Sequence, residues 1–147
     1  MDKETLVEKM RQVLNDFSKN HCGCNDGRYS LILLIPNDPT ALNSKVTLLI
    51  SAPWLDEESS WDVIHSLINI LRKVFGVSET VSTIGGITPV RSSDRSVKMI
   101  NSAYRVTNGK TVDLMNFYAF GVLIEKATIL ESQQLEGKEG REGKEGK

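Results

Sequence analysis

The chain has 147 residues, with 18 Lys and Arg against 19 Asp and Glu, a net charge of −1 and a pI near 6.1. This length predicts one domain whose core needs neither disulfides nor a metal. With 39% hydrophobic and 25% charged residues the composition is that of an ordinary globular protein, and the balanced charge excludes a broad basic face. We therefore expect neither nucleic acid nor a membrane as a partner.

The N-terminal residues carry charges of both signs and lead into an amphipathic segment, unlike a secretory signal peptide. The longest apolar runs, residues 31–35 and 117–124, are shorter than the roughly 20 residues that a membrane helix needs. Only two cysteines occur, Cys22 and Cys24, which is too few for a disulfide framework. These features predict a soluble, cytoplasmic protein.

Residues 136–147 are four Glu-Gly-Lys or Glu-Gly-Arg triplets without an apolar side chain. Such a repeat has nothing to bury and is typical of a disordered tail. The predicted organisation is a single α+β domain over residues 1–135, followed by this tail.

Two amphipathic helices are predicted in the first half of the chain. Apolar residues recur at steps of three and four between Leu6 and Phe17, and Asp2 can act as the N-cap. A second helix is predicted over residues 56–75, where Gly76 ends it.

Between these helices, residues 29–35 and 45–52 predict two antiparallel strands joined by a loop that contains Pro36 and Pro39. Residues 31–35 are apolar on both faces. This pattern is expected of a strand that is covered on both sides or paired with another subunit.

The second half reads mainly as strand. Residues 80–90 surround a Gly85-Gly86 pair, and residues 96–107 alternate. The Asn108-Gly109 pair predicts a hairpin turn, with a return strand that begins near Lys110. A further strand is expected over residues 114–124, and residues 125–135 fit a strand or a short helix.

The predicted fold is therefore α+β: an antiparallel sheet of about five strands with two main helices on one face, in the order α-β-β-α-β-β-β, with a C-terminal helix as an open alternative. On element order alone this arrangement resembles the profilin-like layout of roadblock domains.

One candidate ligand site lies between two of these strands. Arg91, Arg95 and Lys98 share one connection, and guanidinium groups can bind a phosphate or carboxylate in bidentate fashion. Gly85 and Gly86 on the preceding strand would allow a ligand to approach the backbone. The alternative is a solvated hairpin end in which Asp94 pairs with an arginine.

A candidate metal or redox site consists of His21, Cys22 and Cys24, because thiolates and imidazole suit zinc. The single residue between the cysteines argues against a structural zinc site, and His65 is the only other histidine. The alternative is a loop with two free thiols.

The remaining motifs predict no catalytic set. Gly109-Lys110-Thr111 matches only the end of a phosphate-binding loop, and Tyr104 replaces its upstream glycine. The acids near Asp56 are expected at the start of a helix. We therefore expect no cofactor and a non-enzymatic role.

Two strands that are apolar on both faces exceed what one layer of helices can cover, which favours a homodimer. The candidate interface residues are Trp54, Leu31, Leu33, Phe117 and Phe120. The leading hypothesis is a self-associating interaction module, with a protein partner as a further option. The alternatives are ligand binding at the Arg91–Lys98 connection and a metal or redox role for the cysteines.

Overall fold

The computed structural model describes residues 2–21, 27–41 and 44–135. In these ranges the chain is an α+β fold with a five-stranded mixed sheet and four α-helices. The elements in chain order are α1 (Lys3–His21), β1 (Leu31–Pro36), β2 (Val46–Ser51), the 3-10 turn η2 (Pro53–Leu55), α2 (Ser60–Phe75), α3 (Val77–Thr83), β3 (Ile84–Pro89), α4 (Arg95–Ala103), β4 (Val112–Ala119) and β5 (Val122–Ser132). None of the helices in these ranges has the length and hydrophobicity of a membrane-spanning segment. The predicted tail lies outside these ranges.

Both predicted helices of the first half are confirmed. The Asp2 carboxylate accepts a hydrogen bond of 2.8 Å from the Thr5 backbone N–H, which caps α1. Helix α2 begins later than predicted, at Ser60, because η2 precedes it and Ser59 supplies the N-cap. Gly76 ends α2 with a φ of 88°, a value that favours glycine.

The sheet has the order β3-β2-β1-β5-β4. As predicted, β1 and β2 are antiparallel, and β1 also pairs antiparallel with β5. The prediction of an antiparallel sheet is wrong at one edge, because β3 runs parallel to β2. The long connection through α2 and α3 returns the chain to the starting end of β2, as a parallel pair requires.

Parts of two predicted strands are helical. The predicted strand 80–90 begins only at Ile84, because residues 77–83 form α3, and residues 95–103 form α4 in place of most of the predicted strand 96–107. Helix α4 is capped by Asp94, whose carboxylate accepts from the Ser96 N–H at 2.8 Å. Val97 and Ile100, three residues apart, form its buried side.

The predicted strand 114–124 is a hairpin, and the alternative of a C-terminal helix is wrong. Strand β4 ends at Ala119, Phe120 and Gly121 form the turn with φ values of 56° and 79°, and β5 continues to Ser132. A turn is present at Asn108-Gly109, with φ values of 59° and 79°. The predicted hairpin is wrong, because α4 precedes this turn and β4 pairs with β5.

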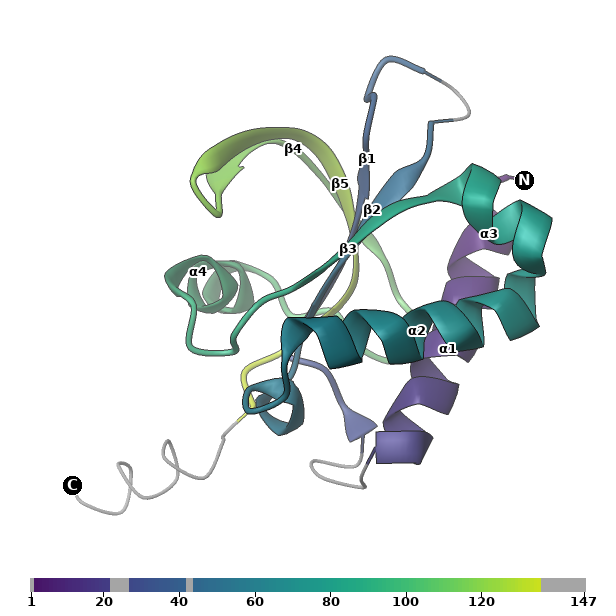
Figure 1. Ribbon diagram of the computed structural model, residues 1–147. Helices are drawn as coiled ribbons and strands as arrows, with labels where there is room; N and C mark the ends of the chain where they lie inside the picture. Colours follow the sequence, from purple (N-terminus) through teal and green to yellow (C-terminus); the bar gives the residue numbers. More distant parts are fainter. Residues whose placement is uncertain (1, 22–26, 42–43, 136–147) are drawn as a thin grey trace.

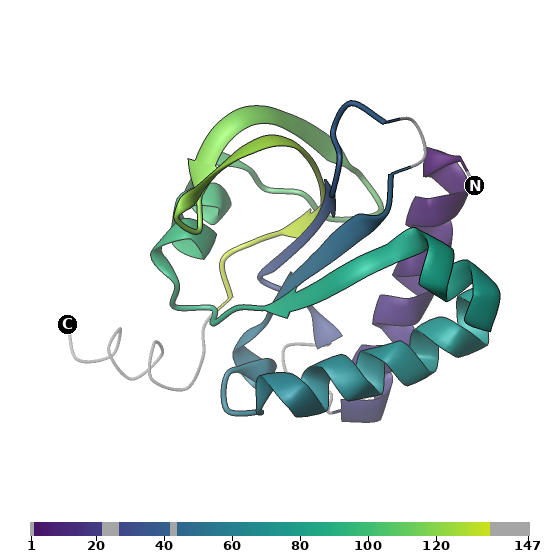
Figure 2. The same ribbon diagram turned by 45° about the horizontal axis from the view of Figure 1, so that its top comes forward.

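The sheet is covered on both faces (Figures 1 and 2). Helices α1 and α2 pack on one face and bury the first core cluster, which includes Phe17 and Leu67. On the other face, α4 and the curled β4–β5 hairpin bury a second cluster that includes Leu33. Both apolar faces of β1 are therefore covered by elements of the same chain.

Candidate functional site

The three predicted cations do not share a connection between strands, because Arg95 is the first residue of α4 and Lys98 lies within that helix, and only Arg91 precedes it. Arg91, Arg95 and Lys98 are all exposed. Ser92 donates through its backbone N–H and its hydroxyl to the carboxylate of Asp56. Because Asp94 already caps α4 with a carboxylate, an anion at this helix start would face a negative charge.

The glycine pair lies away from these cations. Gly85 and Gly86 stand at the start of β3, whereas Arg91 follows its end, so the structure does not bring the predicted set together. A Cβ at Gly85 would lie 2.1 Å from the Asn37 amide nitrogen. The absence of a side chain at Gly85 therefore accommodates Asn37, whose carbonyl oxygen accepts from the Thr47 hydroxyl at 2.8 Å.

The candidate metal ligands Cys22 and Cys24 lie outside the described residues. His21 Nδ1 lies 3.0 Å from the carbonyl oxygen of Phe17, and Nε2 lies 3.4 Å from a Glu58 carboxylate oxygen. No group of three or more His, Cys, Asp or Glu with metal-site geometry occurs in the part of the chain that the structure describes.

Two of the five candidate interface residues, Leu31 and Leu33, are interior, which corrects the prediction for these two. Leu31 and Leu33 are fully buried, and Trp54 packs on the first core cluster while its indole N–H donates to the Arg28 carbonyl. Phe117 and Phe120 are half-buried against the second cluster. The physical reason is α4, which with the curled hairpin forms a covering layer that the sequence did not reveal.

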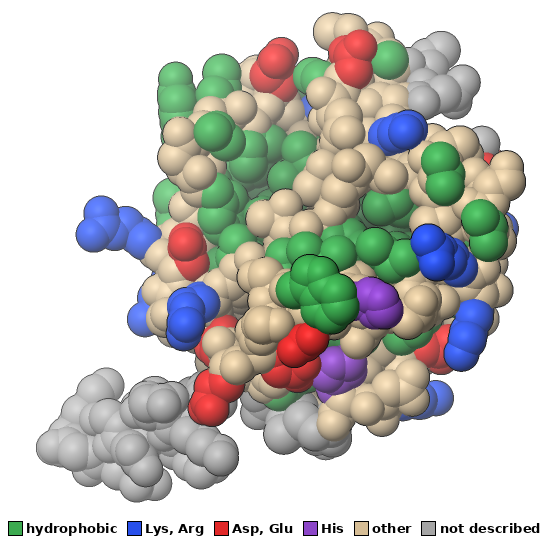
Figure 3. Space-filling view, in the orientation of Figure 1, with side chains coloured by type: hydrophobic (Ala, Val, Ile, Leu, Met, Phe, Trp, Pro, Cys, Tyr) green, Lys and Arg blue, Asp and Glu red, His purple; other side chains and the backbone are tan. Residues whose placement is uncertain are grey.

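The exposed apolar side chains of the sheet gather instead on the β4–β5 hairpin. Met115 is 66% exposed, Tyr118 74%, Val122 56% and Leu123 49%. Figure 3 shows hydrophobic side chains gathered over the region of this hairpin, with few charged groups among them. Exposed apolar surface of this kind commonly marks an interaction site.

The hairpin is bent and held in place. The buried residues of β4 are Leu114 and Ala119, so strict alternation is broken at Asn116, which has a φ of 53°. At the tip, the Phe120 N–H donates to the Ser96 hydroxyl at 2.7 Å, which fixes the turn against α4. A bulky residue at positive φ is costly, and this contact helps to hold it there.

A cleft of about 600 Å³ lies on the face of the sheet that α1 and α2 cover, between α1, α3 and the strands. We call it the helix-side cleft; the apolar side chains that line it include Leu6, Val7, Leu34, Val46 and Met115. Its volume is in the range of small-molecule sites.

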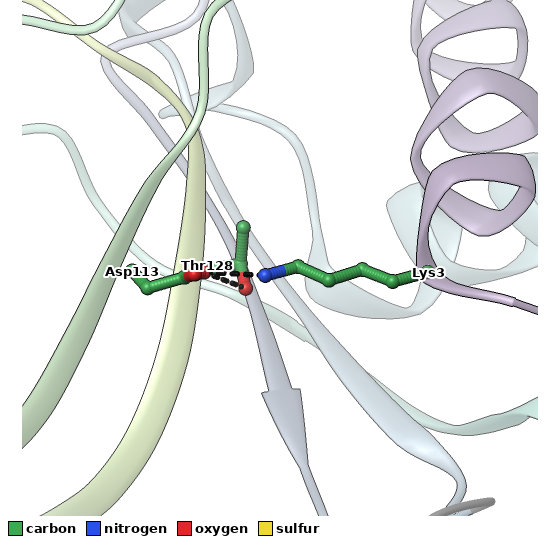
Figure 4. Close-up of polar contacts among 3 residues, drawn as sticks. All are labelled: Lys3, Asp113 and Thr128. Carbon is green, nitrogen blue, oxygen red and sulfur yellow. Dashed lines mark hydrogen bonds and ion pairs between the residues drawn. The ribbon is translucent and has the colours of Figure 1, made fainter.

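An ion pair forms part of the mouth of the helix-side cleft. Lys3 Nζ lies 2.6 Å from the Asp113 carboxylate, which also accepts from the Thr128 hydroxyl at 2.8 Å (Figure 4). The hydrogen bond from Lys3 is the main cause that lowers the pKa of Asp113, so the carboxylate is ionised at neutral pH.

A second acid, Glu131 on β5, is half-buried in the main body of the fold. One of its carboxylate oxygens accepts from the Tyr29 backbone N–H at 2.8 Å and from the Gln133 amide at 2.6 Å. Burial raises the pKa of Glu131 above its ordinary value of 4.5, and these hydrogen bonds and the charges of Arg11 and Arg28 offset only part of that rise.

Glu131→Gln should raise the free energy of unfolding, relative to the wild type, more at neutral pH than at acid pH. As pH rises from 4.5 through the raised pKa, the unfolded chain releases its proton first, so the ionised native Glu131 costs stability. Glutamine keeps an acceptor oxygen for both donors but does not ionise. Chemical denaturation at acid and neutral pH should show the variant gaining stability against the wild type as pH rises. Glu125→Gln, at an exposed position on β5, should show no such gain; equal behaviour of the two variants would contradict this account.

The chain matches no known family model, and comparisons with curated proteins and with solved structures find no similar protein.

Proposed function

We propose that this protein is a non-enzymatic interaction module that self-associates through the outer edge of β4. The observation that carries the proposal is that β4, eight residues long, is a terminal strand of the sheet, and no described strand pairs with its outer edge. An unpaired edge presents backbone N–H and C=O groups that a further strand can bind.

The composition of β4 favours a second copy as that strand. Proteins commonly protect an edge with lysine, proline or a β-bulge; β4 contains no lysine and no proline, and its one irregularity is the bend at Asn116. Its only charged residue, Asp113, is paired with Lys3 of its own chain. Two β4 strands can therefore pair antiparallel about a two-fold axis without like charges opposing each other over residues 114–119.

Apolar contacts would add to this backbone pairing. Tyr118 and Leu123 are cross-strand neighbours in the hairpin register, and both are exposed. In a dimer they would lie beside the new strand pair, where a tyrosine supplies large contact area at low entropic cost.

One of the candidate catalytic acids has a structural use in the fold, which favours a non-enzymatic role. The Asp56 carboxylate accepts hydrogen bonds from the backbone N–H and the hydroxyl of Ser92.

Tyr118→Lys should weaken self-association by at least about tenfold, because it places a charge beside the pairing edge and removes an aromatic contact. Sedimentation velocity over a range of protein concentrations measures this effect. The matched control is Trp61→Lys on α2, because Trp61 is 69% exposed and Tyr118 is 74% exposed. The control should associate as the wild type does. A wild type that stays monomeric at high concentration, or equal effects of the two substitutions, would refute the proposal.

A further inference from the structure

We propose that the helix-side cleft binds a small amphipathic anion, an alkyl carboxylate, with its chain on the apolar floor and its head group at Lys126. This inference is independent of self-association at β4. It rests on the shape of the cleft, the composition of its floor and the distribution of charge around its mouth.

The floor suits an alkyl chain. Leu34 and Val46 come from the centre of the sheet and are almost fully buried, while Leu6 and Val7 of α1 are half-buried above them. Met115 extends the apolar surface toward the mouth. Methionine is flexible and adapts to ligands of different shape.

The charges at the mouth of the cleft favour a negatively charged head group. Lys3 and Asp113 neutralise each other, and Asp113 is further held by Thr128. Lys126 is exposed, lines the cleft and is the cross-strand neighbour of Met115. Among the described residues, Lys126 forms no ion pair within 4.0 Å, and its charge acts on Asp113 only over a longer distance. An anionic head group at Lys126 would form a direct ion pair there.

The α3 side of the cleft sets the orientation of the ligand. Glu79, on α3, also lines the cleft and carries a negative charge. A carboxylate is therefore repelled from the α3 side and attracted to the β5 side, where Lys126 lies. An apolar chain that starts at Lys126 would run toward Leu34 and Val46.

Isothermal titration with octanoate, decanoate and decanol tests the proposal on the full chain. Decanoate should bind about tenfold more tightly than octanoate, because each buried methylene strengthens binding. Lys126→Gln should weaken decanoate by about two- to fivefold, the effect of an exposed ion pair, and leave decanol unchanged. Glu79→Gln, which removes the opposite charge from the same cleft, should not weaken decanoate. Lys98→Gln, on α4 across the sheet, should change nothing.

A second variant tests the location of the alkyl chain. Ser82, exposed on α3, lines the cleft, and Ser82→Trp should fill part of it and weaken octanoate, decanoate and decanol alike by at least several-fold. Thermal unfolding checks that the variant is folded. Absence of decanoate binding, equal binding of octanoate and decanoate, or affinity for decanoate that neither Lys126→Gln nor Ser82→Trp changes would overturn the proposal. The same titrations on Tyr118→Lys distinguish failure of this proposal from failure of self-association. Tyr118 does not line the cleft, so this variant should bind decanoate as the wild type does.

Discussion

Leu33→Ala should lower the free energy of unfolding by about 2–5 kcal/mol, the cost of removing a buried leucine and leaving a cavity. Leu33 is fully buried in the second core cluster, beneath α4 and the β4–β5 hairpin. Urea denaturation followed by tryptophan fluorescence measures this loss. The Tyr118→Lys background is suitable, because self-association should not then contribute.

The exposed Leu123 provides the control, since it lies in the same half of the sheet. Leu123→Ala should change the free energy of unfolding by no more than about 0.5 kcal/mol. If Leu33→Ala cost no more than this control, Leu33 would not be a core residue and the covering role of α4 would be wrong.

Phe17→Ala should be at least as damaging, with a loss of about 3–5 kcal/mol. Phe17 is fully buried between α1 and the sheet, and its ring centroid lies 4.0 Å from that of His21 and 5.9 Å from that of Trp54. Because small domains have a total stability of about 5–15 kcal/mol, this loss brings the variant close to unfolding.

Thermal unfolding of Phe17→Ala and Phe17→Leu distinguishes packing from a general sensitivity of α1. Leucine keeps much of the apolar volume and should cost less than alanine. An alanine variant as stable as the wild type would contradict the position of Phe17 in the first core cluster.

The first half of the fold could be predicted because its signals are local. Apolar residues at helical spacing, the Asp2 cap and Gly76 define α1 and α2. Pro36 is the last residue of β1, and Pro39 lies in the loop that leads to β2. Each of these signals determines the backbone conformation of residues that are only a few positions away in the sequence.

The second half depends on contacts that are distant in sequence. Helix α4 has only nine residues, and a pattern this short fits helical and strand spacing equally well. The direction of β3 is set by the crossover through α2 and α3, which no local pattern in β3 reports. The hairpin turn at Phe120 could not be predicted from the sequence, because a bulky residue at positive φ is rare.

The candidate sites were harder still to predict. Residues 31–35 correctly indicated a strand covered on both faces, but sequence alone could not distinguish a second subunit from α4 as the cover. Met115 and Tyr118 belong to an apolar run that resembles a core strand, and the bend at Asn116 decides which side chains are buried. The helix-side cleft joins segments more than 100 residues apart, such as Lys3 and Asp113.

Amide hydrogen exchange of β4 at low and high protein concentration tests the central claim most directly. If two copies pair through this edge, backbone N–H groups in residues 112–119 should exchange more slowly as concentration rises. Strand β3, which forms the other edge of the sheet and contains Pro89, should exchange at the same rate throughout. Tyr118→Lys should lose the protection of β4. Exchange in β4 that does not depend on concentration, in a wild type studied up to high concentration, would contradict self-association through this strand.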